Sequence, residues 1–405
     1  MKILLADKFQ QSGIDALTAA NHNLIDRPDL NQDNLNDAVT QHDPDILVVR
    51  STKVLAPVFD NARKLSLVVR AGAGYDNIDL PAASRNAISV ANCPGKNAVA
   101  VAELTIGLLI AADRSIPAQT ADLKAGTWAK KTYAKSAAGL KDRTLAVIGL
   151  GHIGTAVVQR AHALELNINA WSRSLDDRTA KALGVTRAAT PLEAARHADA
   201  LTIHTARTPE TTGLINAEIL NALKTNAILV NTARGGIADE TAILDAMNNR
   251  GLKYAADVYD KQPAPTDTSI ADTTKELAKH PNFIGTHHCG ASTEQAQEAT
   301  AAEAVRIIQT YADTGTIPNT VNRETKSPAT QLLRVRHLNK AGVLAHIVSA
   351  ISDANINIEE MENVIYAQGE GACAKIQLDT EPSAEAIEAI RKGKHVLSAD
   401  LTTIP

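Results

Sequence analysis

The segment Thr144-Leu-Ala-Val-Ile-Gly-Leu-Gly-His-Ile-Gly154 carries the clearest structural signal in this 405-residue chain. Its first five residues predict a short buried strand, and three glycines follow at the spacing G-x-G-x-x-G. From Thr155 to Leu164 apolar residues recur at helical spacing. A strand, a glycine turn and a helix are typical of a dinucleotide-binding unit, whose second glycine admits the pyrophosphate and whose helix N-terminus faces the phosphates. We predict cofactor contacts from Gly149, Gly151, His152, Ile153 and Gly154.

A glycine-rich turn in another kind of α/β protein is the alternative, which the flanking strand and helix disfavour. For His152 the alternative is a solvated position at the start of the helix.

Short apolar segments on both sides of this unit predict two parallel sheets. The first would contain Lys2–Ala6, Asp45–Val49, Leu65–Val69 and Ala87–Ala91. The second would contain Thr144–Ile148, Asn167–Trp171, Ala200–His204, Ala227–Asn231, Tyr254–Val258 and Phe283–Gly285. Helical patterns cover Gln11–Ala20, Ala98–Ile110 and Ser292–Asp313. Alternating strands and helices favour an α/β protein with two doubly wound parallel-sheet lobes, one flavodoxin-like and one of Rossmann type.

A third unit follows a polar segment, 315–328, which contains two prolines and reads as a linker. Beyond it, strands are expected at Leu332–His337, Asn357–Tyr366, Ala372–Leu378 and Val396–Leu401. Helices are expected at Ala341–Asp353 and Ser383–Arg391. This βαββαβ order predicts a ferredoxin-like domain.

The composition excludes several classes of protein. Hydrophobic residues make up 44% of the chain and charged residues 21%, which is ordinary for a globular protein. A net charge of −4 gives no reason to expect nucleic acid. No segment is long and apolar enough to span a membrane, and the three cysteines are unpatterned. We therefore expect a cytoplasmic protein without membrane or nucleic-acid partners.

Charged side chains follow several of the predicted strands. Arg50 and Arg70 end strands of the first sheet, while Arg234 and His288 follow strands of the second. Because ligands of such sheets bind beyond the carboxyl ends of the strands, these side chains can converge on one crevice. A nicotinamide enzyme that acts on a 2-oxo acid needs an arginine fork for the carboxylate and a histidine for the proton. Two solvated arginines are the alternative for Arg50 and Arg70.

The chain resembles the D-2-hydroxyacid dehydrogenase superfamily over essentially its whole length, through Ala233-Arg-Gly235, Asp257-Val-Tyr259, Gln262-Pro263 and His288-Cys-Gly-Ala-Ser-Thr293. It is most similar to the branch that oxidises 3-phospho-D-glycerate at the start of L-serine synthesis and carries a C-terminal ACT domain. The resemblance implies NAD as cofactor and a phosphorylated hydroxy acid as substrate. It also implies a homodimer or homotetramer. The lobes implied are 1–94 with 288–316 for substrate and 95–287 for NAD(P), then a linker at 317–329 and the ACT domain at 330–405.

The resemblance also implies a role for individual residues. Arg234 would bind the substrate carboxylate, His288 would exchange the proton, and Asp257 would contact the nicotinamide. Arg50 and Arg70 would hold the substrate phosphate. Further cofactor contacts are expected from Ser172, Arg173, Thr205, Ala233 and Gly290. Further substrate contacts are expected from Ser51, Gly72 and Asn97. An effector, L-serine, would bind at His337, Asn339, Gly342 and Asn357; the alternative is a purely dimerising domain.

Gln262 and Ala341 depart from the family pattern, the latter where family members have proline before the effector-loop glycine, and Ser172-Arg173 departs from the pattern usual in NAD-binding units. Gln262 replaces the catalytic glutamate of the family, so it can orient His288 by a hydrogen bond but cannot favour the imidazolium by charge. Ser172-Arg173 ends the strand at which NAD-binding units usually carry an acidic residue, so NADP is also possible. His204 is expected beside the adenosine, or else as a plain strand-end residue. His287, His288 and Cys289 are contiguous, which is poor spacing for metal ligands, so we expect no metal.

Two other functions stay open. The first is a hydroxypyruvate or glyoxylate reductase that tolerates NADP, which Ser172-Arg173 would favour. The second is a nucleotide-sensing protein similar to the corepressors that share this fold, in which Gln262 would reflect weakened catalysis.

Overall fold

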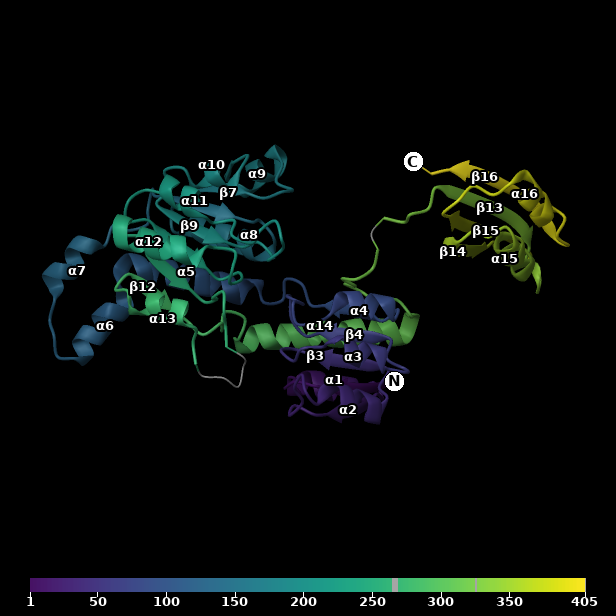
Figure 1. The fold of residues 1–405 in the computed structure, drawn as a ribbon, viewed down its shortest axis with the longest axis horizontal. Coiled ribbons are helices and arrows are strands. Elements are labelled where there is room, and N and C mark those ends of the chain that lie inside the picture. The colour runs from purple at the N-terminus through teal and green to yellow at the C-terminus, as the bar shows by residue number, and fades with distance from the viewer. Residues whose placement is uncertain (264–268, 325, 405) are drawn as a thin grey trace. The chain divides into compact units, whose positions relative to one another are not determined.

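The computed structural model describes residues 1–263, 269–324 and 326–404. It contains two compact units, Met1–Asn322 and Arg323–Pro405, which we treat separately (Figure 1). The first unit holds two parallel sheets and the second holds one antiparallel sheet, so the predicted α/β class with a ferredoxin-like C-terminal domain is confirmed. Within the described ranges, no helix is both long and apolar enough to cross a membrane.

The first lobe is built on a five-stranded parallel sheet in the order β2-β1-β3-β4-β5, which is the flavodoxin-like order. Its strands are β1 Lys2–Leu5, β2 Asn23–Asp26, β3 Ile46–Val49, β4 Leu67–Arg70 and β5 Ser89–Asn92. Its helices are α1 Gln11–Ala19, α2 Leu35–His42, α3 Ala56–Asp60, α4 Leu80–Arg85 and the late helix α14 Glu294–Thr314. Successive strand residues point to opposite faces, so Leu4 packs with α2, α3 and α4 while Ile3 packs with α1 and α14.

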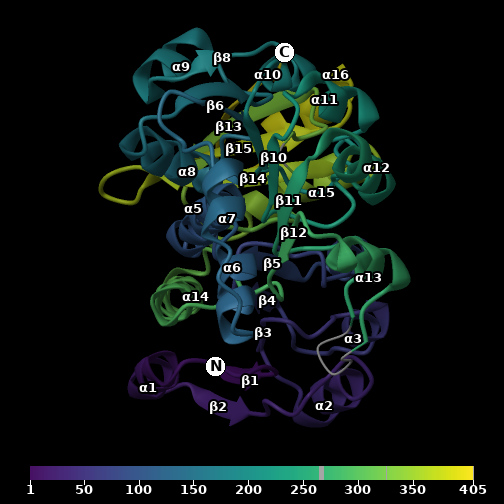
Figure 2. The same ribbon diagram turned by 90° about the vertical axis from the view of Figure 1, so that its left-hand side faces the viewer.

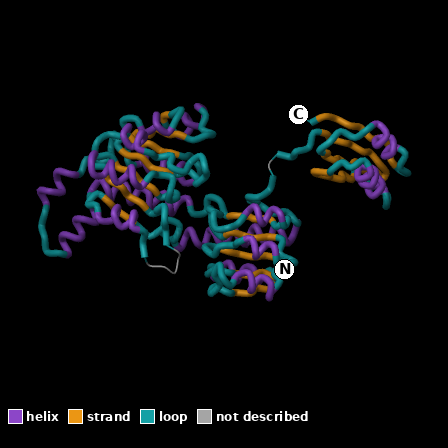
Figure 3. The backbone as a smooth tube through the Cα atoms, in the orientation of Figure 1, coloured by secondary structure: helices purple, strands orange, loops and turns teal. Residues whose placement is uncertain are grey.

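The second lobe is built on a seven-stranded parallel sheet in the order β12-β11-β10-β9-β6-β7-β8. Its strands are β6 Thr144–Ile148, β7 Asn167–Trp171, β8 Thr186–Arg187, β9 Ala200–Ile203, β10 Ile228–Asn231, β11 Lys253–Ala256 and β12 Phe283–Gly285. The order reverses between β6 and β9, which is the switch point of the Rossmann fold. In Figure 3 the strands of each sheet lie side by side.

Helices cover both faces of this sheet, so its strands are buried on both sides (Figure 2). One face carries α5 Ala98–Arg114, α8 His152–Ala163 and α9 Asp177–Leu183. The other carries α10 Pro191–Ala195, α11 Ala217–Ala222, α12 Glu240–Arg250 and α13 Asp272–Lys279. Two more helices, α6 Ile116–Lys124 and α7 Lys130–Ser136, contribute no buried residue and project from this lobe (Figure 1).

The C-terminal unit is a four-stranded antiparallel sheet in the order β14-β15-β13-β16. Its elements are β13 Gln331–Leu338, α15 Val343–Asp353, β14 Ile358–Ile365, β15 Gly371–Leu378, α16 Ala384–Arg391 and β16 Val396–Thr403. Alternate residues of β13, such as Leu333 and Val335, are fully buried and form its core with Ile347 and Ile390. The period of two in the sequence therefore places one face of the sheet against both helices.

Several boundaries differ from the sequence prediction. The fingerprint helix α8 begins at His152 rather than Thr155, because Gly154 is itself a buried helical residue. The first unit continues to Asn322, inside the predicted linker, since Val321 donates a backbone hydrogen bond to Val90 and the Asn322 side chain accepts one from the same residue.

The chain crosses between the two lobes twice. The first crossing, 93–97, joins β5 to α5, and the second, 286–293, joins β12 to α14. The second crossing contains His288.

Candidate active site

The glycine turn after β6 forms an open cradle. Gly149 has a φ of +101°, and a side chain there would lie 2.6 Å from the carbonyl oxygen of His204. A side chain at Gly154 would overlap the carbonyl of Gly149, whereas nothing lies within 4 Å of the position that a Gly151 side chain would occupy. The first and third glycines are therefore required by packing, and the second leaves free space at the N-terminus of α8.

Residues around this cradle leave buried polar atoms without a partner. They are Nδ1 of His204 and Oγ1 of Thr205, both beside Gly149; in the first crossing Oδ1 of Asn97, a predicted substrate contact, is also buried without a partner. Burial lowers the pKa of His204 to about 3, so its ring is neutral, and its Nε2 lies 2.9 Å from Oγ1 of Thr202. Buried polar atoms in folded proteins nearly always have partners, so these atoms suit a polar ligand such as a dinucleotide.

The other predicted cofactor residues border the same cradle. His152 lies against Gly95 of the first crossing, and Ile153 packs on the core beneath α8. Ser172 is half-buried and Arg173 is exposed after β7. A hydrogen bond from Thr208 lowers the pKa of Glu210, and the charge of Arg173 lowers it further. Arg173 and Glu210 are therefore neighbours.

Arg234 is held by the turn that follows β10. The Asn231 side chain accepts a hydrogen bond from the backbone N–H of Ala233 and donates one to the carbonyl of Arg234, which fixes the turn. The guanidinium donates from Nε to Oδ2 of Asp76 at 2.8 Å and from Nη1 to the carbonyl of Ala233 at 2.8 Å. Asp76 belongs to the loop after β4, so this ion pair joins the two lobes.

Asp257 organises the loop that carries His288. Its buried carboxylate accepts hydrogen bonds from Oγ1 of Thr286 at 2.5 Å and from the backbone N–H groups of Cys289 and Gly290, both at 2.9 Å. These three bonds bracket His288, whose φ of +50° lies in the left-handed region. The carboxylate therefore supports a backbone conformation that is unfavourable for a residue with a side chain.

His288 is oriented by Gln262. Its Nδ1 lies 2.8 Å from Oε1 of Gln262, and since an amide oxygen only accepts, Nδ1 carries the proton of the neutral ring. Nε2 is then free to exchange a proton with a ligand. Desolvation lowers the pKa of His288; the charge of Asp257 opposes this effect, and the charges of Arg234 and Arg70 reinforce it.

The first lobe adds two cations. Nη1 of Arg50, after β3, donates to Oε1 of Gln297 on α14 at 3.0 Å. Arg70 ends β4, and its Nε is buried without a partner. Burial and the nearby charge of Arg234 lower the pKa of Arg70 to about 10. Three arginines with Asp76 as a nearby acid make a site that favours anions.

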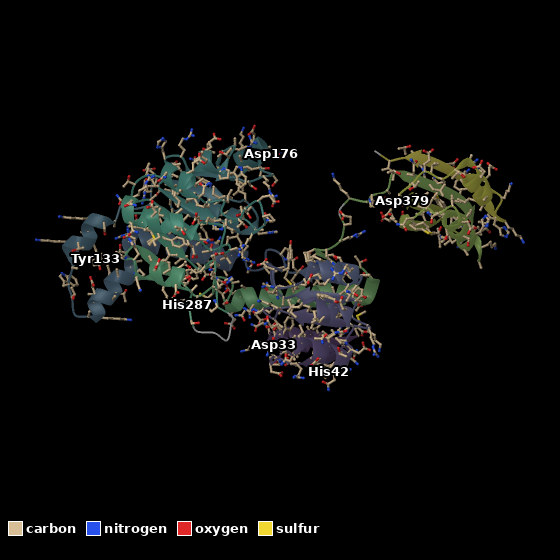
Figure 4. The ribbon with its side chains drawn as sticks, viewed as in Figure 1. Asp33, His42, Tyr133, Asp176, His287 and Asp379 are labelled. Carbon is tan, nitrogen blue, oxygen red and sulfur yellow. The ribbon has the colours of Figure 1, made fainter. Side chains whose placement is uncertain are left out.

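The remaining substrate residues lie beside these arginines. Ser51 is exposed, and its backbone N–H, like that of Arg50, donates to the carboxylate of Asp7. Gly72, with a φ of +156°, leaves room for the guanidinium of Arg70, which a side chain at this position would displace. His287 is exposed and makes none of the contacts that orient His288 (labelled in Figure 4). No cluster of three or more potential metal ligands occurs in the part of the chain that the structure describes.

Sequence reasoning missed Asp76 and Gln297. Asp76 ends the segment Arg70-Ala-Gly-Ala-Gly-Tyr-Asp76, so a carboxylate beyond a strand end was a signal that could have been used. Gln297 lies inside α14, where nothing in the local pattern points to Arg50.

The predicted effector residues lie in the C-terminal unit. His337 is buried, and its ring nitrogens contact the carbonyl of Leu338 and Oδ1 of Asn363. Asn339 donates to the carbonyl of Gly369 at 3.0 Å, and Asn357 donates to Glu359 at 2.7 Å. Gly342, with a φ of +89°, precedes α15.

Comparison with known proteins identifies the class. Residues 106–290 match the model of the D-isomer specific 2-hydroxyacid dehydrogenase, NAD binding domain. The chain belongs to the D-isomer specific 2-hydroxyacid dehydrogenase family, and its second lobe is an NAD-binding domain.

Two similar proteins and one similar solved structure carry the same enzyme name. The chain is 36% identical to the D-3-phosphoglycerate dehydrogenase of Methanocaldococcus jannaschii over 94% of this chain and 69% of that protein. It is 33% identical to the D-3-phosphoglycerate dehydrogenase of Bacillus subtilis, over 93% of this chain and 68% of that protein. A crystal structure of NAD+-bound 3-phosphoglycerate dehydrogenase from Entamoeba histolytica aligns with a TM-score of 0.65 and 27% identity, over 80% of this chain and 99% of that one.

Proposed function

We infer that this chain catalyses hydride transfer between 3-phospho-D-glycerate and NAD, forming 3-phosphohydroxypyruvate in L-serine biosynthesis. The observation that carries this inference is the meeting of Arg50 and Arg70 from one lobe with Arg234 and His288 from the other. Relatives named D-3-phosphoglycerate dehydrogenase over most of the chain support the same activity.

We propose that each side chain serves one part of the substrate. Arg234 binds the carboxylate as a fork, and Arg50 with Arg70 binds the phosphate. NAD held at the glycine cradle would supply the hydride acceptor for C2. Nε2 of His288 takes the proton of the C2 hydroxyl, and Gln262 keeps that nitrogen free by accepting the hydrogen of Nδ1. Asp257 holds the backbone of this loop and can also contact the nicotinamide through a remaining lone pair.

A steady-state assay tests the function. Phosphoglycerate, glycerate and glyoxylate are compared as substrates, each in its own direction, with NAD and with NADP cofactors. We expect the highest kcat/KM for phosphoglycerate or phosphohydroxypyruvate with the NAD couple. A preference for glyoxylate or hydroxypyruvate with NADPH would instead establish the reductase, which the exposed Arg173 favours. No turnover with any pair, despite NAD binding, would favour the corepressor-like alternative.

We also propose that the chain forms a homodimer or homotetramer. The helices α6 and α7 are joined by a hydrogen bond from Tyr133 to Asp122, yet neither buries a residue (Figure 4). Trp128 between them is 78% exposed and Leu123 is 59% exposed. Large apolar side chains concentrated on one projection are typical of an interface. Sedimentation of the purified chain measures the oligomer directly.

L-serine is the proposed effector, bound at the C-terminal unit through Asn339 and Asn357. A cytoplasmic location is proposed as well, and the three free cysteines accord with a reducing compartment.

A further inference from the structure

We propose that Asp76 is a positioning residue for Arg234, supplied by the opposite lobe. This inference rests on the proposed dehydrogenase function, because it concerns the arginine that binds the substrate carboxylate. Neither the strand-end pattern nor the family resemblance assigned a role to Asp76.

The loop after β4 is shaped to receive two guanidinium groups. A side chain at Gly72 would overlap Arg70, and a side chain at Gly74 would overlap Nη2 of Arg234. The first arginine comes from the same lobe as the loop, whereas the second comes from the turn after β10. The two glycines therefore make room for an arginine from each lobe, and Asp76 lies two residues beyond the second.

The contact with Asp76 determines which edge of Arg234 stays free. An arginine side chain has five N–H donors. Asp76 takes the Nε hydrogen, and the carbonyl of Ala233 takes one Nη1 hydrogen. Nη2, beside Gly74, and the second Nη1 hydrogen remain for a carboxylate ligand. The two bonds thus prevent the guanidinium from rotating away from that orientation.

Stability does not explain this ion pair. The Asp76 side chain is 67% exposed and that of Arg234 is 32% exposed. Exposed ion pairs contribute little to folding free energy, whereas the orientation of a binding group within an active site has a large effect on rate. Asp76 is also an acidic neighbour of Arg70 and, together with Asp257, of His288, so it limits the repulsion between Arg70 and Arg234.

The test is a double-variant cycle with Asp76→Asn and Arg234→Lys. Asparagine replaces the charge-assisted bond to Nε by a weaker neutral one, so Arg234 is held less firmly, and lysine keeps the charge but has no fork. Asp76→Asn alone should lower kcat/KM by about ten- to a hundredfold. The loss should be equal for phosphorylated and unphosphorylated 2-oxo acids, since both carry the carboxylate. When Arg234 is already lysine, Asp76→Asn should lower kcat/KM only about twofold, because the group that Asp76 positions is absent.

Two measurements keep the result decisive. The first is the dissociation constant of oxalate from the enzyme–NADH complex, followed by NADH fluorescence in all four variants of the cycle. It needs no turnover, so it tests the coupling of Asp76 and Arg234 whichever 2-hydroxy acid is the true substrate. Tyr75→Phe, in the same loop, is the matched control and should leave both quantities unchanged. The proposal would be overturned if the effects of the two single substitutions on kcat/KM and on oxalate binding multiply in the double variant. It would also be overturned if Asp76→Asn alone leaves both quantities at their wild-type values. Failure of the proposed function would appear separately, as absent turnover by the wild-type chain on phosphoglycerate.

Discussion

Replacing Gln262 by glutamate should shift the pH dependence of catalysis upward. The Oε1 atom of Gln262 lies 2.8 Å from Nδ1 of His288, so a carboxylate at this position would place a negative charge against the ring. An adjacent opposite charge raises the pKa of a histidine by about 1–3 units. The His288 residue is partly exposed although its ring is partly desolvated, and solvent screens the added charge, so we expect a shift near the lower end, about 1 unit.

The sign follows from the proton that each direction requires. Reduction of the oxo acid needs His288 protonated, and oxidation of the alcohol needs it neutral. Desolvation already lowers the pKa of His288, so the wild-type chain should lose reductase activity at an unusually low pH and begin to oxidise there. Gln262→Glu raises the pKa of His288, so both the loss of reductase activity and the onset of oxidation should move to higher pH.

The assay is kcat/KM for phosphohydroxypyruvate and for phosphoglycerate across pH, for wild type and Gln262→Glu. His287→Asn is the matched control, because the His287 ring is exposed, adjacent in sequence and without a hydrogen bond to Gln262. Its profile should superimpose on that of the wild type. If the Gln262→Glu profiles superimpose as well, Gln262 does not contact His288 during catalysis and the tautomer argument fails.

Three other outcomes are expected. Arg50→Ala or Arg70→Ala should lower kcat/KM for phosphohydroxypyruvate by about one to two decades, because each removes a charge-assisted contact worth about 1.5–3 kcal/mol. An equal loss of kcat/KM for glyoxylate would contradict a phosphate site. Ser172→Asp should suppress NADP use by repelling the 2′-phosphate, and unchanged NADP kinetics would remove Ser172 from the ribose site. Asn339→Ala or Asn357→Ala should abolish any serine effect without altering basal turnover, which calorimetry and rate measurements on the full chain can check.

The fold was predictable where burial leaves a periodic pattern. Strands such as β9 and β10 consist entirely of buried residues, so continuous apolar runs marked them. The edge strand β2 carries exposed Asn23 and Asp26, and β8 has only two residues, so neither was marked. The helices α6 and α7 were missed for a related reason, because a helix without a buried face has no apolar periodicity.

The residues of the candidate site that lie at strand ends could be predicted from the sequence. Arg50, Arg70 and Arg234 lie at strand ends of parallel sheets, and the rule for such sheets predicts that they lie near one another. The Asp76–Arg234 pair depends on how two separate lobes meet, which no local pattern encodes. The bond from Arg50 to Gln297 likewise joins residues that are 247 positions apart.

The second crossing between the lobes has a mechanical consequence. Asp257 fastens Thr286, Cys289 and Gly290 to the NAD-binding lobe, while Thr293 caps α14, which packs on the other lobe. The backbone N–H of Ser292 also donates to the carbonyl of Cys289, so the two anchored parts of this crossing are separated only by residues 291–292. A rotation between the lobes about residues 291–292 would carry His288 with the NAD-binding lobe. It would instead vary the distance from His288 to Arg50 and Arg70, so the proposed proton-transfer group would move with the NAD-binding lobe and the two arginines proposed for the phosphate would not.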